Sequence, residues 1–219
     1  MSTTMPTTVS PRSPIRAKHF VWVAFTLMTL LVFGLRERTL LDPHSFLRQR
    51  YSAIPLLMWA HGLPGLIALL LGFFQFSSRL RRRHLQLHRV LGRVYVGCAV
   101  ISAPLSILVA LALPTPTLLP ATIIQAVGWL VTTGTGLYCI RTGRIQQHRA
   151  WMIRSYPFAM VFVVARALMM VPAIDRMGLL GVQMSVWSSI ATACFLPSFI
   201  LAWQEVASSP RSRKALSAA

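Results

Sequence analysis

The chain has 219 residues, of which 55% are hydrophobic and only 12% are charged. This composition excludes an ordinary soluble domain and indicates a protein whose solvent is lipid. The 22 Lys and Arg residues against 4 Asp and Glu give a net charge of +18, which in a polar domain would indicate a nucleic-acid partner. Here the arginines stand in short runs between apolar stretches, so they indicate membrane topology and no nucleic-acid binding.

Six apolar stretches follow a polar beginning. Residues 1–18 are rich in Ser, Thr and Pro, which predicts a disordered tail. An all-α, polytopic transmembrane helix bundle is expected over residues 19–204, followed by a basic tail over residues 205–219. All stretches but the first are long enough, at about 1.5 Å per residue, to cross a hydrocarbon core of roughly 30 Å; the first is at the short limit. The expected spans are residues 19–35, 54–76, 90–113, 118–140, 151–174 and 182–203.

The distribution of basic residues predicts the orientation. Most of them fall in the two tails and in the connections 77–93 and 141–154, which lie on one side if all six stretches cross. Cytoplasmic loops carry the excess of Lys and Arg, so both termini are predicted to be cytoplasmic. The opposite connection 36–51 has four arginines, partly offset by two acids. The sequence contains no Asn, which is typical of a GC-rich bacterial genome, so the bacterial cytoplasmic (inner) membrane is the expected location.

Prolines, glycines and cysteines inside the stretches give further expectations. Prolines free backbone carbonyls within a bilayer, so broken or kinked helices are predicted at Pro64, Pro104, Pro157 and Pro197. Close helix approach is predicted at Gly62, Gly65 and Gly72. Lone cysteines in apolar runs are interpreted as small buried hydrophobes, and these are Cys98, Cys139 and Cys194.

The third and fifth stretches begin in similar ways. Residues 88–95 read His-Arg-Val-Leu-Gly-Arg-Val-Tyr, and residues 148–156 read His-Arg-Ala-Trp-Met-Ile-Arg-Ser-Tyr, with one extra residue in the second copy. Each copy follows an apolar span that ends in a basic loop. The repeat predicts a duplicated helical hairpin, with the two copies parallel and related by an axis along the membrane normal.

Polar residues at fixed places in the apolar stretches carry a family resemblance. The pattern comprises His61, Gly65, Gly72, Gln75, His88, Arg89, Gly92, Arg93, Tyr95, His148, Arg149, Trp151, Met152, Arg154 and Arg166. It resembles the bacterial predicted membrane proteins of the domain-of-unknown-function 2306 family, over roughly residues 54–171. The resemblance implies an architecture, and no established activity.

A first layer of polar residues is predicted near the cytoplasmic side. His84 and His88 are four residues apart on one helical face, and Tyr95 continues that face. His148 enters the bilayer at the same depth on the fifth span, with Met152 one turn further along. Ionisable groups inside a span are costly unless they are paired, so these residues are candidates for function.

This layer suggests a cofactor. Two imidazoles from different helices at one depth suit axial ligation of a b-type haem, here by His88 and His148. Arg93 and Arg154 would then pair with the haem propionates. Alternatively, His84, His88 and His148 form a three-histidine site for zinc or copper. Either group would make the protein redox-linked or metal-dependent at its cytoplasmic side.

The same residues also suit a function without a cofactor. His, Arg, Trp and Tyr at a membrane interface commonly form a belt that fixes helix depth and binds anionic lipid headgroups. On this interpretation the protein is a non-enzymatic structural or assembly factor, whose basic belt binds anionic lipid or a partner subunit in the membrane.

A second polar layer is predicted towards the outer side. His61, Gln125 and Arg166 lie at similar depth, about 10 Å from the outer ends of their spans at the helical rise. Arg166 either extends to the surface or pairs with Asp175 or Asp42. Alternatively, the three form a cluster that binds an anionic or quinone-like ligand or is half of a proton path. With one histidine in this layer, at most one bis-histidine haem is expected.

Motifs of common enzymes are missing from the sequence. It has no Ser-His-Asp set, Walker loop or HExxH motif, and four acidic residues leave no carboxylate pair for acid–base catalysis. The sequence therefore does not decide whether the protein is an enzyme.

Overall fold

A computed structural model describes residues 15–36, 51–113 and 116–208, together with Asp42, His44 and Gln49. The described part is helical and has no strand, which confirms the predicted fold class. Most of both predicted tails, residues 1–14 and 209–219, lies outside it. The elements are α1 (Ile15–Leu31), η1 (Val32–Arg36), α3 (Pro55–Gln75), α4 (Ser78–Arg83), α5 (Leu85–Ala112), η3 (Pro116–Leu118), α6 (Leu119–Arg141), α7 (Ile145–Leu168), α8 (Pro172–Asp175) and α9 (Leu179–Ser208).

Among the described residues, five helices are long and apolar enough to cross a membrane: α3, α5, α6 with η3, α7 and α9. The first predicted span is a shorter apolar helix, Val23–Leu35. However, the 17 residues of α1 continue directly into the five-residue π-helix η1. At about 1.5 Å per residue the joined segment is roughly 33 Å long, the thickness of a hydrocarbon core.

The helix α7 corresponds to the predicted span 151–174 but is shifted towards the N-terminus of the chain. α7 begins six residues earlier, at Ile145, because the polar residues before Trp151 extend the helix beyond its apolar part. It ends at Leu168, well before the predicted end. Pro172 explains this end, because it lacks an N–H group and holds the preceding Val171 in an extended conformation (φ −75°, ψ 118°).

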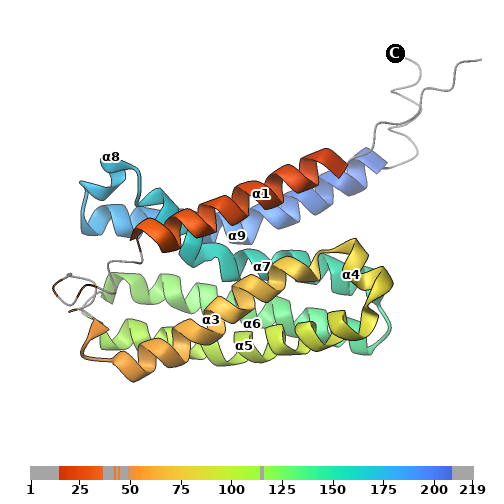
Figure 1. Cartoon of the computed structure of the whole chain (residues 1–219), viewed down its shortest axis with the longest axis horizontal. Helices are drawn as coiled ribbons and strands as arrows, with labels where there is room; N and C mark the ends of the chain where they lie inside the picture. The colour runs from red at the N-terminus through yellow and green to blue at the C-terminus, as the bar shows by residue number, and fades with distance from the viewer. Residues whose placement is uncertain are drawn as a thin grey trace, which may run out of the picture.

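The helices pack as two hairpins with a third layer across them (Figure 1). α3 packs along α5, and α6 packs along α7. The hairpins meet through α5 against α6 and through α3 against α7, the two pairings that a two-fold relation between the hairpins requires. α9 covers α7, and α1 with η1 also contacts α7. The start of α1 and the end of α9 lie at the end of the bundle that holds α4, called the α4 end below (Figure 1).

Close packing within the bundle depends on two glycines of the pattern. A Cβ on Gly72 would collide with the ring of Tyr156, and a Cβ on Gly65 would lie 3.0 Å from the Ser102 hydroxyl. The predicted close approach is thus confirmed at both positions. It is wrong at Gly62, where a Cβ would meet open space.

A buried hydrogen-bond network joins the two hairpins at mid-depth. The Tyr95 hydroxyl on α5 bonds with Ser155 Oγ on α7 (2.9 Å) and accepts the indole N–H of Trp129 on α6 (3.0 Å). Ser155 bonds in turn with Thr133 on α6 (2.7 Å). Each of the four residues is less than 5% exposed. Since lipid offers no hydrogen bonds, such polar groups must pair within the bundle.

The other expectations for the spans have mixed outcomes. The four helices that contain the internal prolines continue through them without a break. Cys98 and Cys139 are buried and Cys194 is half-buried, and all three are free thiols, in agreement with their interpretation as small apolar residues.

Candidate functional site

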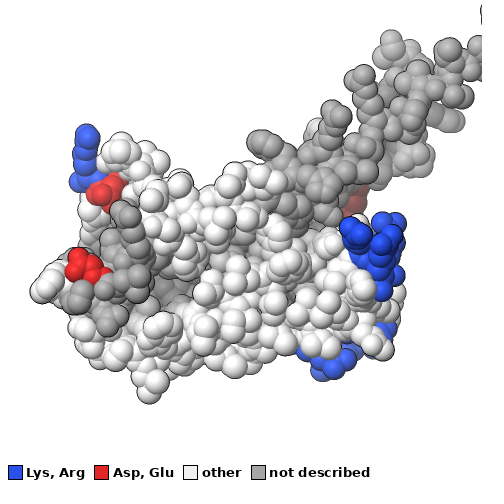
Figure 2. Space-filling view, viewed as in Figure 1, with Lys and Arg blue, Asp and Glu red and all other residues white. Residues whose placement is uncertain are grey.

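Basic side chains gather at the α4 end of the bundle (Figure 2). They come from α4, from the first turns of α5 and α7, and from the connection between α6 and α7. The opposite end has Arg166 and Arg176 together with Asp42 and Asp175 in the described chain. Of the acids that the structure describes, only Glu205, near the end of α9, lies at the α4 end. The arginines of the α4 end are Arg79, Arg81, Arg82, Arg83, Arg89, Arg93, Arg141, Arg144, Arg149 and Arg154.

The short helix α4 positions one of these arginines against the bundle. Ser77 caps α4 by accepting the N–H of Leu80 (3.2 Å). Arg81 then donates from Nη1 to the carbonyl of Gln75, the last residue of α3 (3.0 Å). Burial and the positive charge of Arg149 lower the pKa of Arg81 below its ordinary value. Arginines from the two hairpins are therefore close enough to repel one another.

Gln75 fixes the orientation of the first histidine of the repeat. With its amide turned to satisfy all its neighbours, the nitrogen donates to Nδ1 of His88 (2.8 Å) and to the His88 carbonyl (3.3 Å). The amide oxygen accepts the N–H of Gly92 (3.2 Å). Because Nδ1 accepts a hydrogen bond, the neutral imidazole of His88 carries its hydrogen on Nε2. His88 is therefore an N–H donor on the side away from Gln75.

The second histidine of the repeat is held by a backbone carbonyl. His148 donates from Nδ1 to the carbonyl of Gly136 on α6 (2.8 Å), so the neutral imidazole keeps a lone pair on Nε2. Met152, one turn along α7, packs where a Cβ on Gly136 would be, at 2.8 Å from its sulfur. Gly136 thus allows α6 to approach α7 closely at the level of His148.

The two His-Arg pairs of the repeat come together with Arg81. We call Arg81, His88, Arg89, His148 and Arg149 the α4-end cluster. Arg81, Arg89 and His148 lie within range of electrostatic interaction with His88, and Arg149 lies within that range of Arg81. The hydrogen bonds that orient the two imidazoles use Nδ1 and leave both Nε2 atoms for another partner.

The predicted three-histidine set is not gathered in this structure. His84 lies between α4 and α5, is exposed, and serves as the C-cap of one helix and the N-cap of the other. Among the described residues, no three His, Cys, Asp or Glu side chains lie close enough to hold a metal ion. His88 and His148 are the two members that the fold brings near each other.

The other residues predicted around a haem have different surroundings. Tyr95 is part of the buried network and is only 1% exposed, whereas Arg93 is exposed. Arg154 donates from Nε to Ser198 on α9 (3.1 Å), and its guanidinium lies 5.2 Å from the ring centre of Trp151. Arg154 therefore links α7 to α9.

The outer polar residues each have a separate partner. His61 donates from Nδ1 to the carbonyl of Ser102 (2.9 Å), and the Ser102 hydroxyl donates back to the His61 carbonyl (2.9 Å). Gln125 donates to a backbone carbonyl of α7 (3.2 Å). Arg166 donates to the hydroxyl of Tyr51 (3.4 Å). These hydrogen bonds do not join His61, Gln125 and Arg166 into one cluster.

Gln75 and Ser102 are the residues that sequence reasoning missed as contributors to these sites. Gln75 was part of the family pattern, without a role. Ser102 stands seven residues after Tyr95, which stands seven after His88. This spacing places all three on one face of α5, so it was a signal for a polar face that contacts the neighbouring helices.

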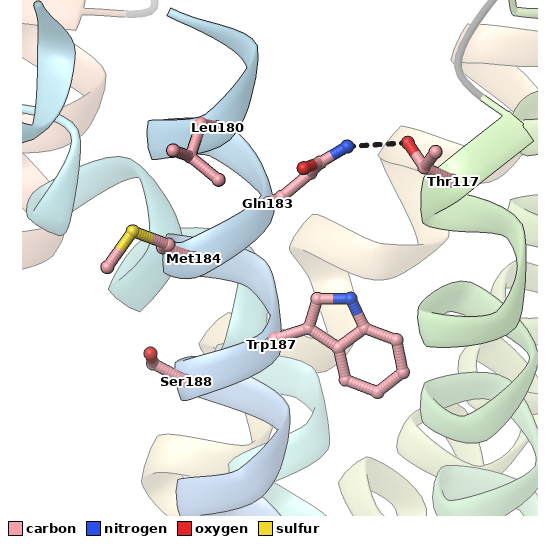
Figure 3. A pocket seen from close by; sticks show the side chains of 6 residues that line it. All are labelled: Thr117, Leu180, Gln183, Met184, Trp187 and Ser188. Atoms are coloured by element: carbon pink, nitrogen blue, oxygen red, sulfur yellow. Dashed lines mark hydrogen bonds between the residues drawn. The ribbon is translucent and has the colours of Figure 1, made fainter. Parts of the chain in front are cut away.

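A groove of about 500 Å³ lies between η3 and the first turns of α9 (Figure 3). Its exposed surface is mostly apolar, although half of its lining residues are polar. Gln183 donates to the Thr117 hydroxyl (2.7 Å) and so links α9 to η3. The lining residues are Thr117, Leu180, Gln183, Met184, Trp187 and Ser188.

Long apolar helices joined by buried hydrogen bonds define this chain as a polytopic helical membrane protein that sits in a lipid bilayer. A family model described as a predicted membrane protein (DUF2306) matches residues 58–205. The chain belongs to this family. The match confirms the resemblance found in the sequence and extends it beyond residue 171 to include α9. No curated protein and no solved structure matches the chain.

Proposed function

We propose that the protein is a non-enzymatic structural or assembly factor of the bacterial inner membrane, which binds anionic phospholipid headgroups through the α4-end cluster. The observation that carries this proposal is the gathering of basic side chains at the α4 end, where Glu205 is the one acid among the described residues (Figure 2). The N–H donors of these side chains suit phosphate oxygens.

The charges of the cluster support the same ligand. Arg81 and Arg149 repel each other, so an anion between the two hairpins would stabilise the arrangement. Arginine pairs well with phosphate oxygens because its N–H groups form a planar fork. Basic pockets between transmembrane helices on the cytoplasmic side are a known mode of binding for anionic lipid headgroups.

The test is to measure anionic lipid retained by the purified protein after Arg89→Gln and Arg149→Gln are introduced together. Both side chains are exposed and belong to the α4-end cluster. Attraction to an anionic surface is about 1 kcal/mol per basic residue. The double variant is therefore expected to bind anionic lipid roughly tenfold or more weakly than the unchanged chain.

Arg176→Gln is the control, because Arg176 is an exposed arginine at the opposite end. It should keep the full amount of lipid. Unchanged retention in the double variant, or an equal loss in the control, contradicts the proposal. Co-purification of a stable protein partner that the double variant loses would instead assign the cluster to a partner subunit.

A b-type haem held by His88 and His148 is the second candidate, and His148 favours it. A metal-bound histidine usually donates its other N–H to a carbonyl or carboxylate, as His148 does to Gly136 (2.8 Å). His88 fits only when the oxygen of the Gln75 amide faces Nδ1, because Nδ1 then carries the hydrogen and Nε2 keeps a lone pair. The donor set therefore fits a haem only in part.

A spectrum of the protein purified in mild detergent tests this second candidate. A Soret band in the dithionite-reduced minus oxidised spectrum, lost in both His88→Ala and His148→Ala, would support a haem with these ligands. A band that persists in both variants would show that the ligands are other residues. A colourless, metal-free protein rules the cofactor out.

A further inference from the structure

The two His-Arg pairs lie the same number of residues from a hydrogen bond between α5 and α7. Tyr95 stands seven residues after His88, and Ser155 stands seven after His148. These two side chains bond to each other (2.9 Å). Both helices start at the α4 end and run the same way (Figure 1). The bond therefore fixes the register of α5 against α7, and it places the two His-Arg pairs at the same depth.

Each pair is anchored by its own hairpin. The imidazole of His88 is held by Gln75 from α3, and that of His148 by Gly136 from α6. α3 precedes α5 in the first hairpin as α6 precedes α7 in the second, so the anchors are equivalent. The cluster thus has two cationic halves, each with a fixed histidine and an arginine next to it in the sequence.

We propose that the α4-end cluster binds one phospholipid whose headgroup carries two phosphodiester groups, with one phosphate on the arginine of each His-Arg pair. This inference rests on the proposed function and specifies its ligand. Each half has one arginine of a His-Arg pair, and the planar fork of an arginine pairs well with one phosphate. Two phosphates in one headgroup balance both halves, and the second contact then forms intramolecularly, which raises affinity.

The ligand is assigned to the membrane and not to a soluble diphosphate. Side chains of α5 beyond the cluster are exposed and apolar, with Val90 50% and Val94 42% exposed. Such a surface next to the cluster suits acyl chains that extend from the headgroup into the bilayer. Figure 2 shows an uncharged surface next to the basic end of the molecule.

Thermal stabilisation of the delipidated full chain in detergent tests the inference. Cardiolipin is compared with phosphatidylglycerol at twice the molar concentration, so that phosphates and acyl chains are matched. The half-saturating concentration should be at least about tenfold lower for cardiolipin. Its two phosphates are covalently connected, so the second one binds without the entropy cost of a second lipid. Inorganic pyrophosphate, added as a soluble competitor, should not displace cardiolipin.

Variants of the two halves separate the possible outcomes. Arg89→Gln and Arg149→Gln should each remove the preference for cardiolipin and keep binding to phosphatidylglycerol, whereas Arg176→Gln should keep both. Equal stabilisation by the two lipids overturns this inference and leaves the proposed function standing. No stabilisation by either lipid overturns both. Displacement of cardiolipin by pyrophosphate overturns the assignment to a membrane lipid.

Discussion

Single hydroxyl groups hold the interior of this bundle together. The Tyr95 hydroxyl takes part in two hydrogen bonds, to Ser155 (2.9 Å) and from Trp129 (3.0 Å), and thereby touches three helices. In a soluble protein water could replace a lost partner. In a bilayer the partners of a missing hydroxyl stay unpaired, although measured costs in membrane proteins are moderate, about 0.6 kcal/mol on average and up to roughly 2 kcal/mol.

Tyr95→Phe should therefore destabilise the protein by about 1 kcal/mol or more, because the indole N–H of Trp129 loses its acceptor. A chain of this size should then unfold about 2–4 °C lower. Thermal unfolding in detergent measures the change. Tyr138→Phe is the matched control, since Tyr138 is 58% exposed on α6. Equal unfolding temperatures for the two variants would contradict the role assigned to the network.

The sequence predicted some residues of the site and not their partners. His88 and His148 could be chosen because ionisable groups in apolar stretches are costly and because they recur. Their hydrogen bonds to Gln75 and Gly136 could not be predicted, since these depend on how α3 and α6 are rotated against their neighbours. The same reason explains the outer layer, where similar depth predicted one cluster but each side chain has its own partner.

At the scale of the helices, the packing of α3 against α7 depends on the contact between the Tyr156 ring and Gly72. Tyr156 on α7 lies against Gly72 on α3 and donates its hydroxyl to the carbonyl of Leu69 (2.9 Å). Phe25 of α1 contacts the same ring at 6.3 Å between centroids. Three helices thus meet at Tyr156, and the position of α3 against α7 depends on the missing side chain at residue 72.

Gly72→Ala should destabilise the bundle by about 1–3 kcal/mol, because the added methyl group displaces the Tyr156 ring and its hydrogen bond. Gly134→Ala is the control on α6, where a Cβ meets open space. In a helix that change should be neutral or stabilising by up to about 1 kcal/mol. The stabilities of both variants are measured by unfolding in detergent. A Gly72→Ala protein as stable as Gly134→Ala would show that α3 and α7 do not need this contact.

Helix existence was predictable from hydropathy, whereas helix ends were not. Apolar stretches located the spans because lipid accepts only backbone that is internally hydrogen-bonded. The bounds of α7 differ because the mostly polar residues 145–150 can continue a helix outside the apolar core, and because Pro172 stops one inside an apolar run. Local backbone chemistry therefore overrides hydropathy at the ends of the helices.

At the scale of the whole molecule, the charge distribution and the fold single out the same end of the bundle. The α4 end carries most of the described arginines, and the start of α1 and the end of α9 lie at that end (Figure 1). Six helical segments that alternate in direction bring the start of α1 and the end of α9 to one side. The rule for basic residues assigns that side to the cytoplasm, and this orientation stays a prediction.

Labelling of single cysteines should test this orientation. The native thiols Cys98, Cys139 and Cys194 are first replaced by Ala, and one new cysteine is placed at Gln146 or at Ala173. Gln146 is exposed at the start of α7, at the α4 end, and Ala173 is exposed in α8 at the opposite end.

A membrane-impermeant maleimide should label Ala173→Cys in intact spheroplasts, and Gln146→Cys only after the membrane is opened. The physical reason is that the arginines around residue 146 resist transfer across the membrane, whereas the region of α8 balances Arg176 with Asp175. The reverse labelling pattern would put the α4-end cluster outside the cell. In that case the charge bias would not set the topology of this chain, and the cluster would face the outer leaflet.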